Sequence, residues 1–403
     1  MGPFPVVLFI PLALCLGGLP EERMTTSQIV DFYGYPIEEF ESQTEDGYIL
    51  KLQRIPFGKT PRGLSTSSKP VVFFQHGFIA SSADWVTNLP HQSAAFVFAD
   101  AGFDVWMGNV RGNVYSRGHV NKTKHFWEFS WDEFAKYDLP AMIDTVLNIT
   151  GDDSLYYIGH SQGTEIMFAK LAEDPGFGKK FIFLIKKFFA LAPVATVSNL
   201  HGFLSYMGRF FGKDISKFFE FFGSYEFLPN NFLTKLFAEI TCGWKFTNPL
   251  CDNVLFQIGG PESNQFNTTR LMVYMKHTPA GTSTQNFVHW VQLTQTNRTL
   301  KYDYGSAAEN EKHYGQPTPP EYDLTRVQTP VYLYYSPSDW IADENDVKTA
   351  ILDKIHPQYL KRVKPMEDFN HFDFIWGLNA RKLVYDEIIK TCMGHYIRTK
   401  NHF

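Results

Sequence analysis

The sequence has no excess of positive charge. Its 403 residues carry 37 Lys and Arg against 42 Asp and Glu, a formal net charge of −5 at pH 7. Proteins that bind nucleic acid usually concentrate basic residues to neutralise phosphates. Nucleic acid is therefore excluded as the expected partner. With 44% hydrophobic residues, the chain is long enough for one or two domains around a large core.

The sequence also has no hydrophobic run long enough to span a membrane, and it has one shorter run near the N-terminus. The run from Val6 to Leu16 is too short to span a bilayer, but it has the length of a signal-peptide core, and small residues follow it at Gly17 and Gly18. We therefore predict a signal peptide over residues 1–19, no transmembrane segment and a secreted protein, with the lysosome as the alternative destination. A buried N-terminal strand is the competing interpretation.

Cysteine is scarce, with four residues in the chain. Cys15 would leave with the signal peptide. Cys242 and Cys251 lie close together around turn-forming glycine, asparagine and proline residues, which suits a small disulfide loop in a secreted protein. Such a loop would contribute about 2.5 kcal/mol through loop entropy. Cys392 would then remain a free thiol.

Metal-ligand spacing is absent among the His, Cys and Asp residues, so we predict neither a metal nor a cofactor. N-x-S/T sequons are present, and secretion would make them candidates for glycosylation. They begin at Asn121, Asn148, Asn267 and Asn297.

Strand patterns and helix patterns alternate through most of the chain. A hairpin pattern runs over residues 38–55 around the turn Glu45-Asp46-Gly47, and a short helix precedes it at 27–33 with Ser27 as a possible cap. Further strands are predicted at 70–74, 103–107, 156–158, 188–192, 331–335 and 360–363, and further helices at 94–98, 131–146 and 380–393. This alternation favours an α/β fold with a mostly parallel central sheet flanked by helices.

The chain is rich in aromatic residues, with 38 Phe and 20 Tyr, and its pattern changes after about residue 196. We predict an α/β core over residues 20–195 and 319–403, and a helical cap over the sheet at 196–318. An apolar stripe on one helical face of the cap is interpreted as packing, and lining of an acyl site or contact with a lipid surface is the alternative. The stripe consists of Phe211, Ile215, Phe218, Phe219 and Phe222.

Residues 159–163, Gly-His-Ser-Gln-Gly, lie between an apolar strand pattern and a helical one. Glycines on both sides of Ser161 allow the sharp turn of a nucleophile elbow, which exposes the hydroxyl above the sheet. The motif alone is weak, because three fixed residues at about 7% usage occur by chance in roughly one chain in ten of this length. The strand before and the helix after make Ser161 the predicted nucleophile. His160 is expected to pack beside it.

A serine hydroxyl needs an adjacent base, and the base needs an orienting acid. In chains with a nucleophile elbow the order is serine, acid, histidine. Asp339 comes just after the strand at 331–335, and His371 lies in the last loop before the closing helix, so we predict them as acid and base. Asp343 and Asp346 are the alternatives for the acid, and a structural core histidine is the alternative for His371.

The oxyanion that forms on attack needs two backbone N–H donors. In this fold class, one donor belongs to the residue after the serine and the other to the loop after the third strand. The corresponding residues here are Gln162 and Phe78, which follows His76-Gly77.

Long specific strings spread over the chain resemble the acid lipase family, which includes gastric lipase and lysosomal acid lipase. They include GYPIEEFESQTEDGYIL, VVFFQHGFIASSADWV, FADAGFDVWMGNVRGN, YYIGHSQGT, HTPAGTSTQNFVHW and NHFDFIWGL. The resemblance implies an α/β-hydrolase core with a helical cap and a movable lid, acting on esters of medium or long acyl chains. It supports the roles given to Ser161, Asp339, His371, Phe78 and Gln162, and the pairing of Cys242 with Cys251. The family usually has leucine where Phe78 stands.

We therefore expect a serine ester hydrolase, a triacylglycerol lipase that acts on lipid esters at a lipid–water interface. We expect it to be a monomer. A carboxylesterase or sterol esterase is the alternative within the same class of enzymes. A non-catalytic lipid-binding protein on a hydrolase fold is the alternative from a different class.

Overall fold

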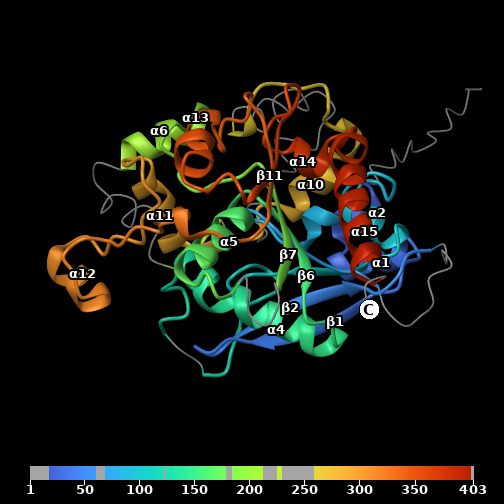
Figure 1. Cartoon of the computed structure of the whole chain (residues 1–403), viewed down its shortest axis with the longest axis horizontal. Helices are drawn as coiled ribbons and strands as arrows, with labels where there is room; N and C mark the ends of the chain where they lie inside the picture. The colour runs from blue at the N-terminus through green and yellow to red at the C-terminus, as the bar shows by residue number, and fades with distance from the viewer. Residues whose placement is uncertain are drawn as a thin grey trace, which may run out of the picture.

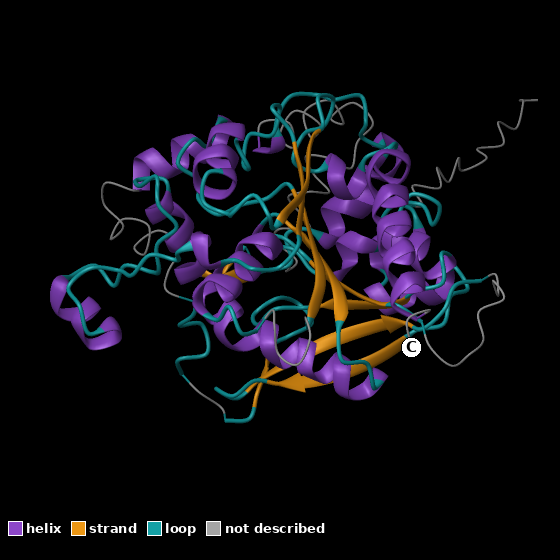
Figure 2. Cartoon of the chain, viewed as in Figure 1, coloured by secondary structure: helices purple, strands orange, loops and turns teal. Residues whose placement is uncertain are grey.

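The central feature of the computed structural model is a twisted β-sheet with helices on both faces (Figure 2). The structure describes residues 18–59, 69–121, 124–177, 184–211, 225–228 and 258–400. In Figure 1, α5 lies on one side of the sheet and α2 and α15 lie on the other. The strands in the middle of the sheet are completely buried, as expected for a sheet covered on both faces.

The strand order of the main sheet is β1-β2-β4-β3-β6-β7-β10-β11, and β5 pairs with β2. β1, β2 and β4 pair antiparallel, whereas every pairing from β4 to β11 is parallel. The bounds are β1 Glu38–Gln43, β2 Tyr48–Ile55, β3 Val71–Gln75, β4 Asp104–Gly108, β5 Gly118–His119, β6 Leu155–His160, β7 Ile185–Leu191, β10 Val331–Tyr335 and β11 Leu360–Pro365.

Helices precede, connect and follow these strands. Their bounds are α1 Thr26–Phe32, α2 Ala94–Asp100, α3 Trp131–Glu133, α4 Leu139–Thr150, α5 Gln162–Glu173, α13 Glu344–Asp346, α14 Asp373–Trp376 and α15 Asp386–Lys400. The predicted alternation of strands and helices is confirmed, and the parallel strands all direct their carboxyl ends to one edge of the sheet, where open α/β sheets place their sites.

Three local predictions were wrong in detail. Thr25, not Ser27, caps α1, because its side chain accepts a hydrogen bond from the N–H of Gln28. The helix predicted at 131–146 is interrupted by a π-helical segment at Phe134–Asp138 and continues to Thr150. The closing helix continues to Lys400.

The segment predicted as a cap, residues 196–318, contains helices and only a short two-stranded sheet among its described residues. These elements are α6 Gly202–Phe211, β8 Glu226–Phe227, α10 Leu271–His277, β9 Thr282–Ser283, α11 Thr284–Leu293 and α12 Ala307–Tyr314. In Figure 1, α12 extends away from the body of the molecule. The division into core and cap remains a prediction, and most of the phenylalanine stripe lies outside the described residues.

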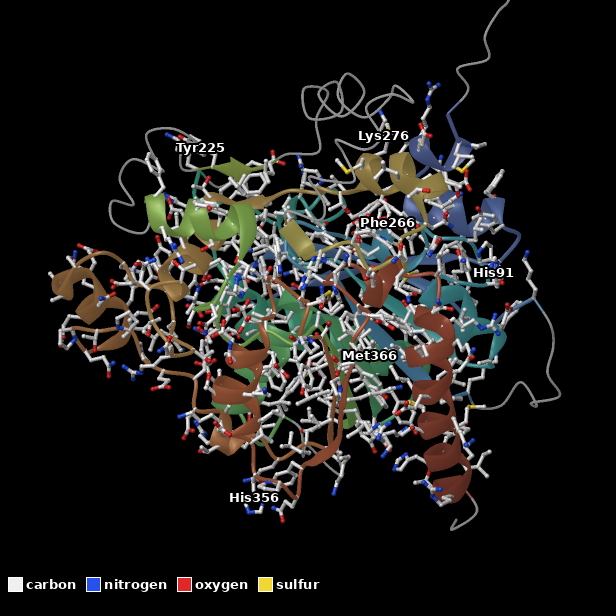
Figure 3. The ribbon with its side chains drawn as sticks, turned by 90° about the horizontal axis from the view of Figure 1, so that it is seen from above. His91, Tyr225, Phe266, Lys276, His356 and Met366 are labelled. Atoms are coloured by element: carbon white, nitrogen blue, oxygen red, sulfur yellow. The ribbon has the colours of Figure 1, made fainter. Side chains whose placement is uncertain are left out.

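Part of this segment packs onto the C-terminal half of the core. Phe266, labelled in Figure 3, forms an antiparallel bridge with Gly377 just after α14. Its ring contacts Trp376, and Trp376 in turn stacks on Tyr274 of α10 with ring centroids 4.5 Å apart. These contacts join α10 to the end of the loop that carries His371.

The start of the described chain is also fixed to α10. Arg270 lies just before this helix and donates a 2.7 Å hydrogen bond to Glu21, and both side chains are buried. The imidazole Nε2 of His277 donates to the carbonyl oxygen of Glu21 at 2.8 Å. The predicted signal peptide lies almost entirely outside the described residues and remains a prediction.

Candidate active site

Ser161 occupies the sharp turn between β6 and α5. Its backbone has φ 53° and ψ −122°, a conformation that non-glycine residues rarely adopt. The two flanking glycines are required by close approach: a Cβ on Gly159 would lie 2.6 Å from the carbonyl oxygen of Gly163, and one on Gly163 would lie 2.4 Å from that of Gln75. The G-x-S-x-G spacing is therefore explained by space as well as by the turn.

The structure brings Asp339 and His371 together from separate loops. Asp339 lies after β10 and His371 lies after β11, and these strands are parallel neighbours. The imidazole Nδ1 of His371 donates to Asp339, at 2.9 Å from Oδ2 and 3.0 Å from Oδ1. Asp339 Oδ1 also accepts the N–H groups of Ile341 and Ala342 at 2.9 and 2.8 Å. These two backbone hydrogen bonds fix the carboxylate of Asp339 independently of the His371 ring.

The two alternative acids lie in other pairs. Asp343 Oδ2 is 3.0 Å from Nε2 of His201, a histidine whose side chain is 54% exposed. Asp346 accepts hydrogen bonds from the backbone and side chain of Asn199 at 2.9 and 2.7 Å. The geometry therefore favours Asp339 as the partner of His371.

His160 lies directly before Ser161 and connects the elbow to the loop of His371. Its Nε2 donates to the carbonyl oxygen of His371 at 2.9 Å, and the two rings have centroids 4.9 Å apart. Burial lowers the pKa of His160 to about 3, so its ring is neutral at ordinary pH. His160 packs beside Ser161, as predicted, and its hydrogen bond holds the backbone of His371.

The loop after β3 passes over Ser161. A Cβ on Gly77 would lie 3.0 Å from the Cβ of Ser161, so only glycine fits there without a shift. The next residue, Phe78, is the one predicted to donate its N–H to the oxyanion. His76 fixes this loop, because its Nδ1 donates to the carbonyl oxygen of Gly77 at 2.8 Å and its Nε2 accepts the N–H of Val110 at 3.3 Å.

Helix α11, for which no role was predicted, lies against this site. Trp290 on α11 has its ring centroid 4.9 Å from that of Phe78, and Asn286 exchanges hydrogen bonds with the side chain of Gln162. Both residues belong to the string HTPAGTSTQNFVHW, which carried part of the family resemblance. The resemblance of this string to the family indicated that the segment matters. Nothing in its composition or spacing indicated which residues it would contact.

Several other predictions concern features outside this site. Cys242 and Cys251 are outside the described residues, so their pairing remains a prediction, and Cys392 is a buried free thiol. The four sequons also remain predictions. Among the described residues, no group of three or more His, Cys, Asp or Glu side chains is arranged to hold a metal ion, and no helix there is long and apolar enough to cross a membrane.

Asp84 is buried in the short 3-10 helix Ser82–Trp85 after the Phe78 loop, and we expect it to make the stability of the protein depend on pH. Burial raises its pKa from 3.8 to about 7, so the folded state favours the protonated acid. A raised folded-state pKa gives a stability contribution that is full below about pH 4 and is lost as the pH rises through about 7. Buried histidines such as His76 and His289, whose pKa values are lowered, contribute with the opposite sign.

A single substitution isolates the effect of Asp84. Between pH 5 and pH 8.5, we expect the free energy of unfolding of Asp84→Asn to fall by about 3 kcal/mol less than that of the wild type, because the amide has no proton to lose. Urea denaturation at both pH values measures the difference. Equal losses in the two proteins would show that Asp84 does not titrate in this range.

Two family models match this chain, and the similar proteins include lipases. Residues 26–89 match the family model described as a partial alpha/beta-hydrolase lipase region, and residues 70–378 match the one described as the alpha/beta hydrolase fold. The chain is 54% identical to lipase lipl-1 of Caenorhabditis elegans, over 92% of this chain and 91% of the relative.

Two human proteins are similar over the same extent. Gastric triacylglycerol lipase is 44% identical, with 92% of each chain covered, and lysosomal acid lipase/cholesteryl ester hydrolase is 42% identical, with 92% of this chain and 91% of the relative covered. Among solved structures, an epoxide hydrolase from Vigna radiata aligns with a TM-score of 0.52 at 15% identity, over 89% of this chain and 98% of its own. This last similarity concerns the fold alone.

Proposed function

This chain belongs to the acid lipase family of α/β hydrolases, and from that premise we propose that Ser161, Asp339 and His371 are its nucleophile, acid and base. The chain is a carboxylic ester hydrolase of the triacylglycerol lipase type, acting on lipid esters. The observation that carries the assignment of residues is the 2.9 Å pairing of His371 with Asp339, beside the strained elbow of Ser161.

The reaction proceeds in two steps. His371 Nε2 takes the proton of the Ser161 hydroxyl as Oγ attacks the ester carbonyl, and the resulting oxyanion is held by the N–H groups of Phe78 and Gln162. Collapse of this intermediate expels the alcohol, which receives the proton from His371, and leaves the acyl group on Ser161. Water then attacks the acyl-enzyme with His371 again as base, and the fatty acid is released. Asp339 holds the ring in the tautomer with Nδ1–H and stabilises the imidazolium.

The side chains of the proposed catalytic residues lie below the surface of the protein. Ser161, Asp339 and His371 are 2%, 1% and 2% exposed, so a lipid ester has to enter the protein to reach the serine. In enzymes of this kind, the substrate reaches the active site when a lid opens. We therefore propose that the enzyme works at a lipid–water interface, where an apolar surface stabilises the open form. We also propose that it acts as a monomer and is secreted, with the lysosome as the alternative.

Hydrolysis of a short-chain triacylglycerol at increasing concentration tests this proposal. We expect fatty-acid release to rise steeply once the substrate exceeds its solubility and forms an emulsion, because the interface favours the open form. Ser161→Ala serves as the blank. Saturation below the solubility limit, with no rise on emulsification, would identify a carboxylesterase for dissolved esters instead. A correctly folded protein that releases no fatty acid at any concentration would contradict catalysis altogether.

A further inference from the structure

Helix α11 contacts both residues whose backbone N–H groups are the proposed oxyanion donors. Phe78 belongs to the loop after β3 and Gln162 is the first residue of α5, so the two donors come from different elements. An oxyanion hole works only when both donors keep a fixed position relative to the reacting carbon. The inference below rests on the proposed function and concerns what keeps these donors in place.

The first contact is a reciprocal pair of buried amides. The Gln162 side chain donates from Nε2 to Oδ1 of Asn286 at 3.2 Å, and Asn286 donates from Nδ2 to Oε1 of Gln162 at 3.3 Å. Asn286 is completely buried and Gln162 is 3% exposed. A buried amide pair of this kind leaves little rotational freedom, because breaking it would leave polar groups unsatisfied.

Asn286 is itself fixed at the start of α11. Its Nδ2 also donates to Thr282 Oγ1 at 3.0 Å, and its backbone N–H donates to the capping side chain of Ser283 at 2.9 Å. The amide that holds Gln162 is therefore anchored to a helix terminus and does not depend on Gln162 for its orientation.

The second contact is an aromatic stack one helical turn further along α11. The rings of Trp290 and Phe78 lie with centroids 4.9 Å apart and planes 22° from parallel. The indole Nε1 of Trp290 donates to Glu165 Oε2 at 3.0 Å. Glu165 lies on α5, three residues after Gln162, so this bond connects the stack back to the helix that starts at the nucleophile.

Glu165 is suited to this position as a neutral acid. It is 1% exposed, and burial raises its pKa well above the usual range for a carboxyl group. A neutral carboxyl group accepts the indole N–H without placing an unpaired charge behind the catalytic serine. It also means that glutamine can replace the acid with nearly the same shape and an acceptor in the same place.

We propose that Asn286 and Trp290 are positioning residues of the oxyanion hole, which hold the N–H groups of Gln162 and Phe78 at a fixed separation through one rigid helix. Neither residue touches the substrate in this account. Asn286 contacts the side chain of Gln162, and Trp290 contacts the side chain of Phe78. The backbone N–H groups of Gln162 and Phe78 are the proposed oxyanion donors. Glu165 supports the arrangement by holding the indole of Trp290.

The test is steady-state kinetics of Asn286→Ala and Trp290→Leu on a soluble short-chain ester. Loss of one complete donor lowers kcat by about 10²- to 10³-fold in related chemistry, so a displaced donor is expected to lower it by about 10- to 100-fold while KM changes little. Trp290→Phe keeps a ring on Phe78 and should lose less than Trp290→Leu. If Trp290→Leu does not fold, Trp290→Phe tests the role of Trp290 in its place.

Gln292→Ala provides the matched control on the same helix. Gln292 exchanges hydrogen bonds with the backbone of Asp303 at 2.7 and 2.9 Å, so its removal breaks a similar amide contact of α11 away from Phe78 and Gln162. We expect its kcat to stay within about twofold of wild type, since the oxyanion donors are not disturbed. An equal loss of kcat in Gln292→Ala and Asn286→Ala would show a general effect of destabilising α11 and would overturn the inference.

Binding of an arylboronic acid separates positioning from stability. This probe forms a tetrahedral adduct on serine, so its Ki should rise in parallel with the fall in kcat/KM across the variants. Glu165→Leu should behave like Trp290→Leu, and Glu165→Gln should recover a large part of the loss. Folded variants with wild-type kcat, or a raised KM with unchanged kcat, would contradict the inference. If instead Ser161→Ala retains full turnover, the proposed function itself fails.

Discussion

His371→Ala is expected to lower kcat for ester hydrolysis by about 10⁶-fold, and Ser161→Ala by a similar factor, because either change removes the activated nucleophile completely. The double variant should lose no more than either single one, since the two side chains act as a unit. Turnover of a soluble nitrophenyl ester, with folding checked by circular dichroism, measures the effect. A His371→Ala protein that is folded and within tenfold of wild type would show that another base serves Ser161.

Asp339→Asn should lower kcat by about 10⁴-fold, because an amide in place of the carboxylate favours the wrong tautomer of the ring. Asp343→Asn is the matched control, since Asp343 is the nearby acid that pairs with the half-exposed His201 instead. We expect Asp343→Asn to retain activity close to wild type. The reverse result, a larger loss in Asp343→Asn than in Asp339→Asn, would assign the acid to Asp343.

The second large effect concerns stability and the buried guanidinium of Arg111. This side chain is 1% exposed in an ion pair with Asp138, which is 0% exposed, at 2.7 Å. It also contacts Asp46 in the β1–β2 turn, and it lies over the ring of Tyr48 at 3.8 Å. Asp138→Ala is expected to cost about 3–5 kcal/mol, because it leaves a buried charge without its fully buried partner. The urea midpoint and slope measure this loss.

Asp46→Ala is the control for this pair. Asp46 binds the same guanidinium but its side chain is 28% exposed, so water can replace part of the lost interaction. We expect a loss of about 1 kcal/mol there. Equal losses in the two variants would show that burial does not determine the strength of this network.

The elements that position the proposed site were predictable because their causes are local. β6 is mostly apolar and completely buried, Gly159 and Gly163 permit the turn, and α5 has a helical period, so the elbow follows from the residues between Leu155 and Glu173. Asp339 and His371 were placed by strand ends, and parallel neighbours bring strand ends to the same edge. The hairpin of β1 and β2 followed from the Asp46-Gly47 turn in the same way.

The contacts of α11 could not be predicted because they depend on tertiary packing. Asn286 and Gln162 are 124 residues apart, and nothing in either local sequence names the other as a partner. The same holds for the interrupted helix at Phe134–Asp138, where a local period of 3.6 residues gives no sign of the π-helical turn. The prediction of Ser27 as the cap of α1 overlooked a local signal, because Thr25 and Gln28 have the spacing of a capping box and both of its hydrogen bonds are present.

The central claim is that Ser161 carries the acyl group during turnover, and an alkyl phosphonate ester tests it most directly. This reagent reacts with an activated serine and leaves a stable tetrahedral adduct. We expect mass spectrometry of the digested protein to find one adduct, on the peptide that contains Ser161, together with complete loss of activity. Ser161→Ala should remain unlabelled. An active, folded protein that is not labelled at Ser161, or one that is inactivated by labelling at another residue, would contradict the account.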